Sequence, residues 1–292
     1  MRSFCFNRIL AGVIILLLTV TFFYACSKNT NDAAPTNDSD NKAIAAAAYQ
    51  ASVNVIYDDL FGVALEVGMR ESLNETGRKA NTQPVSKLSG CFDVLKDDIG
   101  NDSWPKTLLI DFKGGCADAT GRLRAGTLQI IFSGYFYYPG SVIVVKPLTY
   151  TMNGVSVTGT ATITNIGTSD MPKFTVAIAG GAVKLDTLNI TYGSKNTLTQ
   201  VEGLLTPSDV LDDIFSIYGT DSLSFSNGIK ATTEVKESEP LQRGIECAWV
   251  GKGKALVTVN GQTASINYGN GICDDSATVE LGDKIRGIKM PQ

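Results

Sequence analysis

The chain has 292 residues, with 25 basic and 29 acidic side chains, six cysteines and no histidine. The absence of histidine excludes His-based catalytic triads and dyads and His-ligated zinc sites. The mildly acidic balance, without interleaved basic and aromatic runs, argues against nucleic acid as a partner.

The N-terminus has the features of a bacterial lipoprotein signal. Arg2 and Arg8 precede an uncharged run, residues 9–25, which is followed directly by Cys26. The run is shorter than the roughly 20 residues that span a bilayer comfortably. We therefore predict a signal peptide over 1–25 and lipidation of Cys26, which places the protein in the bacterial cell envelope, at the outer membrane. Its periplasmic or surface orientation stays open, and the alternatives are a retained membrane anchor or an ordinary signal peptide.

A tether and a helix are expected next. Residues 26–42 are rich in Asn, Asp and Ser, which predicts a disordered tether. Residues 43–74 form a predicted amphipathic helix, and 75–90 a linker. We expect the helix to pack against the β domain, with a coiled-coil stalk or partner helix as the alternative. Apolar residues recur along it in steps of four and three at Tyr49, Val53, Ile56, Leu60, Val63 and Val67.

From residue 91 to 292 the apolar pattern changes to period two. The segment VSVTGTATIT, residues 155–164, alternates apolar and polar residues, as strands do in antiparallel sheets with one wet face. Asn-Gly pairs beginning at Asn153, Asn227 and Asn260 predict tight hairpins. The predicted fold class is mainly β: a large antiparallel domain, built as a sandwich, roll or long meander, preceded by one amphipathic helix.

One phrase occurs twice, as LIDFKGGCADA at 109–119 and as SINYGNGICDD at 265–275. Each copy ends near a cysteine that lies within one residue of facing an earlier cysteine across a predicted turn. In an exported protein this predicts two hairpins stapled by disulfides, with a bulge absorbing the slip in the second copy. Four buried free thiols are the alternative. The predicted pairs are Cys91–Cys116 and Cys247–Cys273.

The segment WPKTLLIDFKGGCADATGRLRAG and the later INYGNGICDDSAT resemble the signature of uncharacterised lipoproteins from Bacteroidota. The resemblance covers residues 91 to 290. It implies an envelope location and a β-rich fold, and no established activity. Lys113 stands where the family usually has Gly, and Asn267 where it usually has Asp.

Six residues are candidates for contact with a ligand. Two arginines share a strand face near two acids, which suits a small anion or a glycan; cross-strand ion pairs on a wet face are the alternative. The segment GYFYYPG would place one aromatic pair in the core; the other pair would lie on a covered sheet face or, alternatively, form an exposed platform for sugar or a partner protein. These candidates are Arg122, Arg124, Asp111, Asp118, Tyr135 and Tyr137.

No cofactor is expected, although the acidic pairs at 97–98, 212–213 and 274–275 leave calcium open. Adjacent carboxylates on a strand point to opposite faces, so no pair alone forms a glycosidase site. The predicted function is a non-catalytic binding or structural module. The alternative is a carboxylate-based hydrolase of envelope or extracellular glycan. Expected partners are the membrane, through the lipid, and a glycan or another envelope protein.

Overall fold

The computed structural model describes residues 38–71, 90–96, 103–118, 120–168, 170–206 and 209–290. The predicted signal peptide and the lipidation site, Cys26, lie outside the described residues. The described elements are α2 (Asp38–Arg70), β1 (Asp93–Lys96), β2 (Lys106–Asp111), β3 (Cys116–Ala117), β4 (Leu123–Ala125), β5 (Thr127–Phe132), β6 (Val142–Pro147), β7 (Thr151–Met152), β8 (Val155–Ser156), β9 (Thr158–Asn165), β10 (Lys173–Leu185), β11 (Leu188–Glu202), β12 (Ile214–Phe225), β13 (Lys230–Val235), β14 (Leu241–Gly244), β15 (Lys252–Val259), β16 (Gln262–Asn270), β17 (Ser276–Leu281) and β18 (Lys284–Lys289).

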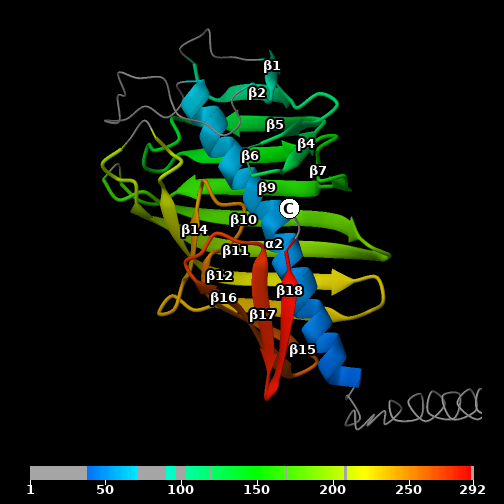
Figure 1. The fold of residues 1–292 in the computed structure, drawn as a ribbon. Helices are drawn as coiled ribbons and strands as arrows, with labels where there is room; N and C mark the ends of the chain where they lie inside the picture. The colour runs from blue at the N-terminus through cyan, green and yellow to red at the C-terminus, as the bar shows by residue number, and fades with distance from the viewer. Residues whose placement is uncertain are drawn as a thin grey trace, which may run out of the picture. The chain divides into compact units, whose positions relative to one another are not determined.

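One large antiparallel sheet dominates the structure (Figure 1). Its strands run in the order β1-β2-β5-β6-β9-β10-β11-β12-β13-β15-β16-β17-β18, and β14 pairs with β12 and β15. Most neighbours in the sheet are also neighbours in the chain, so the long meander is the arrangement adopted. A small sheet, β3-β4-β7-β8, lies apart from it. The predicted mainly β fold class is confirmed.

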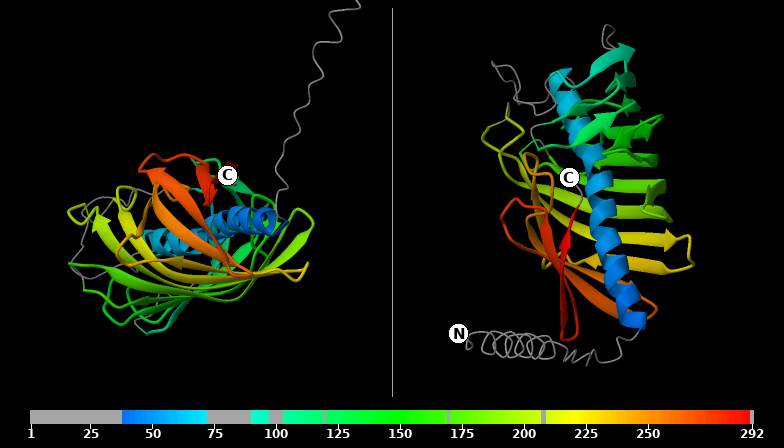
Figure 2. Two further views of the ribbon diagram at one scale, coloured as in Figure 1. Left: turned by 90° about the horizontal axis from the view of Figure 1, so that it is seen from below. Right: turned by 45° about the vertical axis from the view of Figure 1, so that its right-hand side comes forward.

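The helix α2 lies inside the curve of the large sheet (Figure 2). It contacts β6, β9 and β10 as well as β15 to β18. From Val55 to Met69 every residue is buried except Asp58, which is intermediate. A helix that is apolar all round is expected to be enclosed. The coiled-coil stalk is therefore wrong, because the helix has no free apolar stripe to offer a partner. The helix also starts at Asp38, inside the predicted tether.

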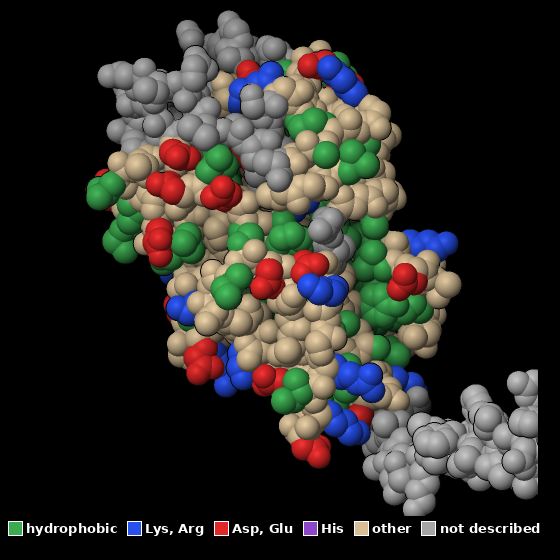
Figure 3. Space-filling model, viewed as in Figure 1, with side chains coloured by type: hydrophobic (Ala, Val, Ile, Leu, Met, Phe, Trp, Pro, Cys, Tyr) green, Lys and Arg blue, Asp and Glu red, His purple; other side chains and the backbone are tan. Residues whose placement is uncertain are grey.

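The helix and the sheet form one compact unit, Asp38–Gln292. Of the predicted linker, residues 75–90, only Gly90 is among the described residues. On the face shown in Figure 3, acidic and basic side chains are interspersed with apolar ones. No helix in the described part of the chain is both long and apolar enough to cross a membrane.

The sheet has a bulge in β10 beside Tyr57 of the helix. The pairing of β10 with β11 shifts by one residue between Ile178 and Gly181, which marks a bulge that increases strand curvature. A Cβ at Gly181 would lie 2.7 Å from the Tyr192 carbonyl oxygen and 2.8 Å from the hydroxyl oxygen of Tyr57, so a larger residue would displace the neighbouring strand or the helix side chain. Tyr57 also stacks on Tyr192 at 4.7 Å and donates a hydrogen bond to the Thr158 carbonyl.

All three predicted Asn-Gly hairpins form. Asn153 and Asn260 have φ of 50° and 51°, and each is followed by glycine at positive φ, as a type I′ turn requires. At the remaining hairpin, Asn227-Gly228, only Gly228 has a positive φ. There the amide of Phe225 donates to the Ile229 carbonyl around a three-residue loop, so this hairpin uses a different turn.

Both predicted disulfides are present, Cys91–Cys116 and Cys247–Cys273, with Cα–Cα distances of 5.3 and 5.7 Å. The predicted bulge lies between Lys252 and Lys254, but its extra residue is on β16. An extra residue on β16 shifts the position that faces Cys247 further from Cys273. The bulge therefore does not correct the one-residue offset between the two cysteines. The second bridge closes instead between loops, outside the ends of β15 and β16.

The doubled phrase encodes the same turn in both places. Asp111 and Asn267 each accept a hydrogen bond from the backbone amide two residues ahead, at 2.8 and 3.0 Å. Those residues, Lys113 and Gly269, have φ of 57° and 88°. Lys113 thus occupies a left-handed backbone conformation that favours glycine, which agrees with the Gly expected there from the resemblance. The repeat serves the architecture of the strand ends, and the Asp111 carboxylate takes part in this turn.

Candidate functional site

A buried ion cluster joins α2 to the start of the small sheet. Asp59 of α2 receives Arg124 side-on: the guanidinium Nε donates to Oδ2 at 3.0 Å and Nη2 to Oδ1 at 2.5 Å. Arg122 Nη1 also donates to Asp59 Oδ1 at 2.9 Å, and the Tyr150 hydroxyl to Oδ2 at 2.6 Å. All four of these side chains are buried. One helical carboxylate therefore binds the guanidinium groups of Arg122 and Arg124 and a phenol.

A second carboxylate completes the cluster. Asp118 accepts from Arg124 Nη1 at 2.7 Å, and from the backbone amide and hydroxyl of Thr120 at 2.8 and 2.6 Å. Arg122 also donates to the carbonyl of Ala248, which is next in the chain to the bridged Cys247. The two stapled segments, distant in sequence, are therefore joined through Arg122.

Charge compensation keeps the cluster ionised. Burial opposes ionisation of Asp59, but Arg124 and Arg122 outweigh it and hold its pKa well below the ordinary range. Burial likewise opposes ionisation of Asp118, and Thr120 and Arg124 lower its pKa. Buried pairs of this kind contribute modestly to stability when complete and cost several kcal/mol when one partner is removed.

The arginines predicted for ligand contact are thus internal. Arg122 and Arg124 have 1% and 0% exposure, which does not agree with contact to an anion or glycan from solvent. The alternative of ion pairs on a wet face is also wrong, because the main partner is Asp59, on a helix that covers them. The sequence signal for Asp59 was present: an acidic pair, Asp58-Asp59, interrupts the apolar stretch that runs from residue 55 to residue 65.

The aromatic segment at 135–138 does not alternate as a strand would, because it forms a turn. Phe136 and Tyr137 are both fully buried, so Tyr137 is a core residue and not a platform. Tyr135 is half-buried and Tyr138 is 55% exposed. One aromatic pair is buried and one is directed outward, as one of the alternatives predicted. The buried pair is Phe136 and Tyr137, however, and the outward pair is Tyr135 and Tyr138.

The outward pair lines a pocket of about 410 Å³ with Trp104. The Trp104 and Tyr135 rings meet edge to face with centroids 5.0 Å apart. Ser141 also lines the pocket; it is 4% exposed, and its hydroxyl has no hydrogen-bond partner among the described residues. The pocket therefore combines aromatic walls with one buried hydroxyl.

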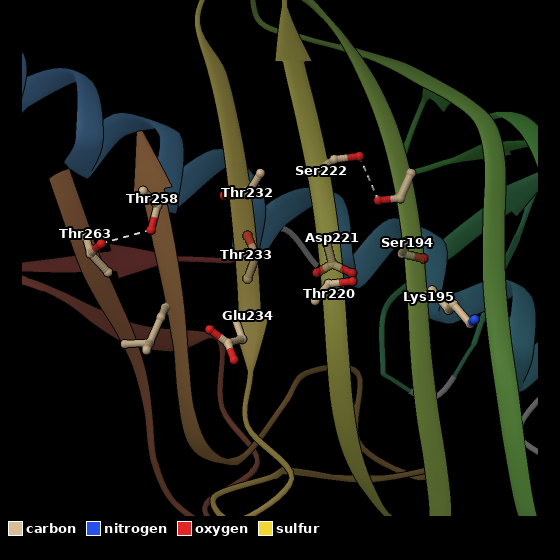
Figure 4. A pocket seen from close by; sticks show the side chains of 12 residues that line it. Ser194, Lys195, Thr220, Asp221, Ser222, Thr232, Thr233, Glu234, Thr258 and Thr263 are labelled. Carbon is tan, nitrogen blue, oxygen red and sulfur yellow. Dashed lines mark hydrogen bonds between the residues drawn. The ribbon is translucent and has the colours of Figure 1, made fainter. Parts of the chain in front are cut away.

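A third polar region lies where β11, β12 and β13 run side by side over α2 (Figure 4). This hollow of about 590 Å³ is lined mainly by Ser and Thr side chains. Asp221 lies in it, 6% exposed, and accepts hydrogen bonds from Gln50 of α2 at 2.8 Å and from Asn196 at 2.9 Å. Both donors are neutral amides, and burial raises the pKa of Asp221 to about 6. No cation contacts this carboxylate among the described residues.

The acidic pairs considered for calcium are engaged locally where they are described. Asp274 accepts from the Ser276 amide, and Asp275 pairs with Lys289. Asp213 is buried and accepts from Gln200. Among the described residues no group of three or more acidic or cysteine side chains is placed to hold a metal ion.

Fold and site together define a disulfide-stapled antiparallel β protein wrapped around one helix, with a buried ion cluster and small surface pockets. Comparisons with protein-family models, with curated proteins and with solved structures gave no match. The resemblance to Bacteroidota lipoproteins therefore stays a prediction.

Proposed function

We propose that the protein is a lipid-anchored protein of the bacterial cell envelope that acts as a non-catalytic binding module for a sugar. The sugar would occupy the pocket of Trp104, Tyr135 and Tyr138. The observation that carries this proposal is the aromatic wall beside the buried Ser141 hydroxyl. Binding pockets combine apolar and aromatic walls with a few placed polar groups.

The chemistry of the pocket supports a polyhydroxylated ligand. Tyr and Trp present large apolar faces together with polar tips, and the faces suit the C–H surface of a pyranose ring. A buried hydroxyl without a partner is energetically unfavourable, so a ligand hydroxyl that bonds Ser141 would gain affinity. The pocket volume of about 410 Å³ suits one monosaccharide.

A glycan array on the lipidated, oxidised protein, followed by calorimetry on the sugars it retains, tests this proposal. Tyr138→Ala, at an exposed residue, should weaken binding about tenfold or more without loss of folding. Tyr218→Ala is the matched control, because Tyr218 lies outside the pocket and its ring contacts Lys173. Retention of no sugar by the wild type, or equal effects of the two variants, would contradict the proposal.

The carboxylate-based hydrolase is an outcome of the same experiment. Retained oligosaccharides are incubated with the protein, and new reducing ends are measured. Release of reducing ends would replace the non-catalytic module by the hydrolase.

A further inference from the structure

A separate pocket of about 610 Å³ lies beside the Cys247–Cys273 bridge. Arg243 of β14 lines it, together with Trp249, Leu211 and Lys252. None of these residues belongs to the sugar pocket proposed above, so a ligand in this second pocket would be independent of that sugar.

Arg243 is buried, with 4% exposure, yet only one of its three guanidinium nitrogens has a partner. Nη1 lies 3.5 Å from Asp58 Oδ2. Nε and Nη2 have no hydrogen-bond partner among the described residues. A buried donor without a partner is energetically unfavourable, and more so when the group is charged.

The two unpartnered donors share one edge of the guanidinium plane. The Nε–H and Nη2–H bonds point the same way, which is the side-on geometry that receives both oxygens of a carboxylate or phosphate. Arg124 already uses this edge for Asp59 in the same protein. Arg243 lines a pocket, and its corresponding edge is buried and meets no carboxylate among the described residues.

Of the three buried arginines in this region, Arg243 has the longest ion pair, at 3.5 Å. Arg122, Arg124 and Arg243 are all buried, and the fully buried carboxylates Asp59 and Asp118 hold the first two. Arg243 faces Asp58, whose side chain is 28% exposed. Burial raises the pKa of Asp58, and Arg243 and Arg122 offset the rise only in part.

The pocket wall itself carries both signs of charge. Lys252 is basic, and two acids, Asp212 and Glu246, oppose it. Asp212 already accepts a hydrogen bond from the Thr206 hydroxyl at 2.5 Å. Specific recognition must therefore come from the fork of Arg243, since the wall provides no excess of positive charge.

We propose that this pocket binds a small ligand through a carboxylate or phosphate group held side-on by Arg243, with the uncharged part of the ligand against Trp249. Acidic sugars and sugar phosphates both carry this chemistry. The sugar phosphate and the acidic sugar are separate arms of the test.

Calorimetry on the oxidised wild-type protein uses glucuronate, glucose 6-phosphate, glucose and the methyl ester of glucuronate. One of the two anions should bind at least tenfold more tightly than glucose, and the ester should behave like glucose. The tighter anion identifies the carboxylate or the phosphate as the recognised group. Anions that bind no better than glucose and the ester overturn the proposal without any need for a variant.

Arg243→Lys keeps the charge and removes the fork, so it should weaken the preferred anion at least tenfold. Arg286→Lys is the matched control, since Arg286 is an exposed residue on β18. Thermal unfolding checks that both variants fold. A folded Arg243→Lys variant that binds the anion with wild-type affinity would also overturn the proposal. Absence of sugar binding at the Trp104 pocket would not affect it, because the two pockets share no residues.

Discussion

Replacing Asp59 by Asn tests the role given to the buried ion cluster. The change keeps the size of the side chain and removes the charge that two guanidinium groups and the Tyr150 hydroxyl contact. Asp118 remains, and of the two guanidinium groups it pairs only with that of Arg124. Arg122 would then be buried with no ion-pair partner. Breaking a buried pair in this way costs about 3–5 kcal/mol.

The measurement is urea unfolding of the oxidised protein, followed by tryptophan fluorescence and far-UV circular dichroism. The free energy of unfolding should fall by about 3–5 kcal/mol with little change in its dependence on urea concentration. Asp93→Asn is the control at an exposed ion pair. The side chains of Asp93 and its partner Lys113 are 55% and 60% exposed, so we expect a change below about 1 kcal/mol.

The pH dependence of the same pair of proteins gives a second check. The pKa of Asp59 is held well below its value in the unfolded chain. Its contribution to stability is therefore fully present above about pH 4 and is lost as the pH falls further. The difference in free energy of unfolding between wild type and Asp59→Asn should be constant from about pH 5 to 8 and should become smaller at acidic pH. A cost for Asp59→Asn within about 1 kcal/mol of the control at neutral pH would refute this account of the cluster.

Three other sites give predictions of their own. Because the pKa of Asp221 is raised to about 6, its ionisation should lower stability by up to about 3 kcal/mol as pH rises from about 4 to 7; Asp221→Asn should remove this slope in pH-dependent unfolding, and an unchanged slope would contradict the assignment. Replacing Cys91 and Cys116 by alanine should cost about 2–5 kcal/mol, while peptide mapping still finds the other bridge; scrambled pairing would count against independent staples. Cys26→Ser should release the protein from membranes and abolish labelling by a fatty-acid probe; a variant that stays membrane-bound after signal removal would place the anchor elsewhere.

The strands and the staples were predictable because their signals are local. Alternation with period two, Asn-Gly pairs and cysteine spacing each concern residues close in sequence. The Asn153 turn shows this: its residues alone determine the backbone conformation that the structure adopts.

The partners of the ion cluster were not predictable in the same way. Asp59 and Arg124 are separated by 65 residues, and their contact depends on how the sheet curves around the helix. The aromatic segment shows another limit. Alternation paired Tyr135 with Tyr137, but a turn lacks a two-residue period, so Tyr137 points into the core.

The enclosure of α2 has a consequence for the order in which the protein can fold. The helix is the first described element in the chain, whereas β15 to β18, which cover it, are the last. Hairpins close quickly from local contacts, but contacts between distant segments form slowly. Part of the apolar surface of the helix must therefore stay exposed to solvent until the C-terminal strands have folded onto it. A chain ending at Asp275, before β17 and β18, should bind a hydrophobic dye much more strongly than the full-length protein, and equal dye binding would show that the earlier strands cover the helix unaided.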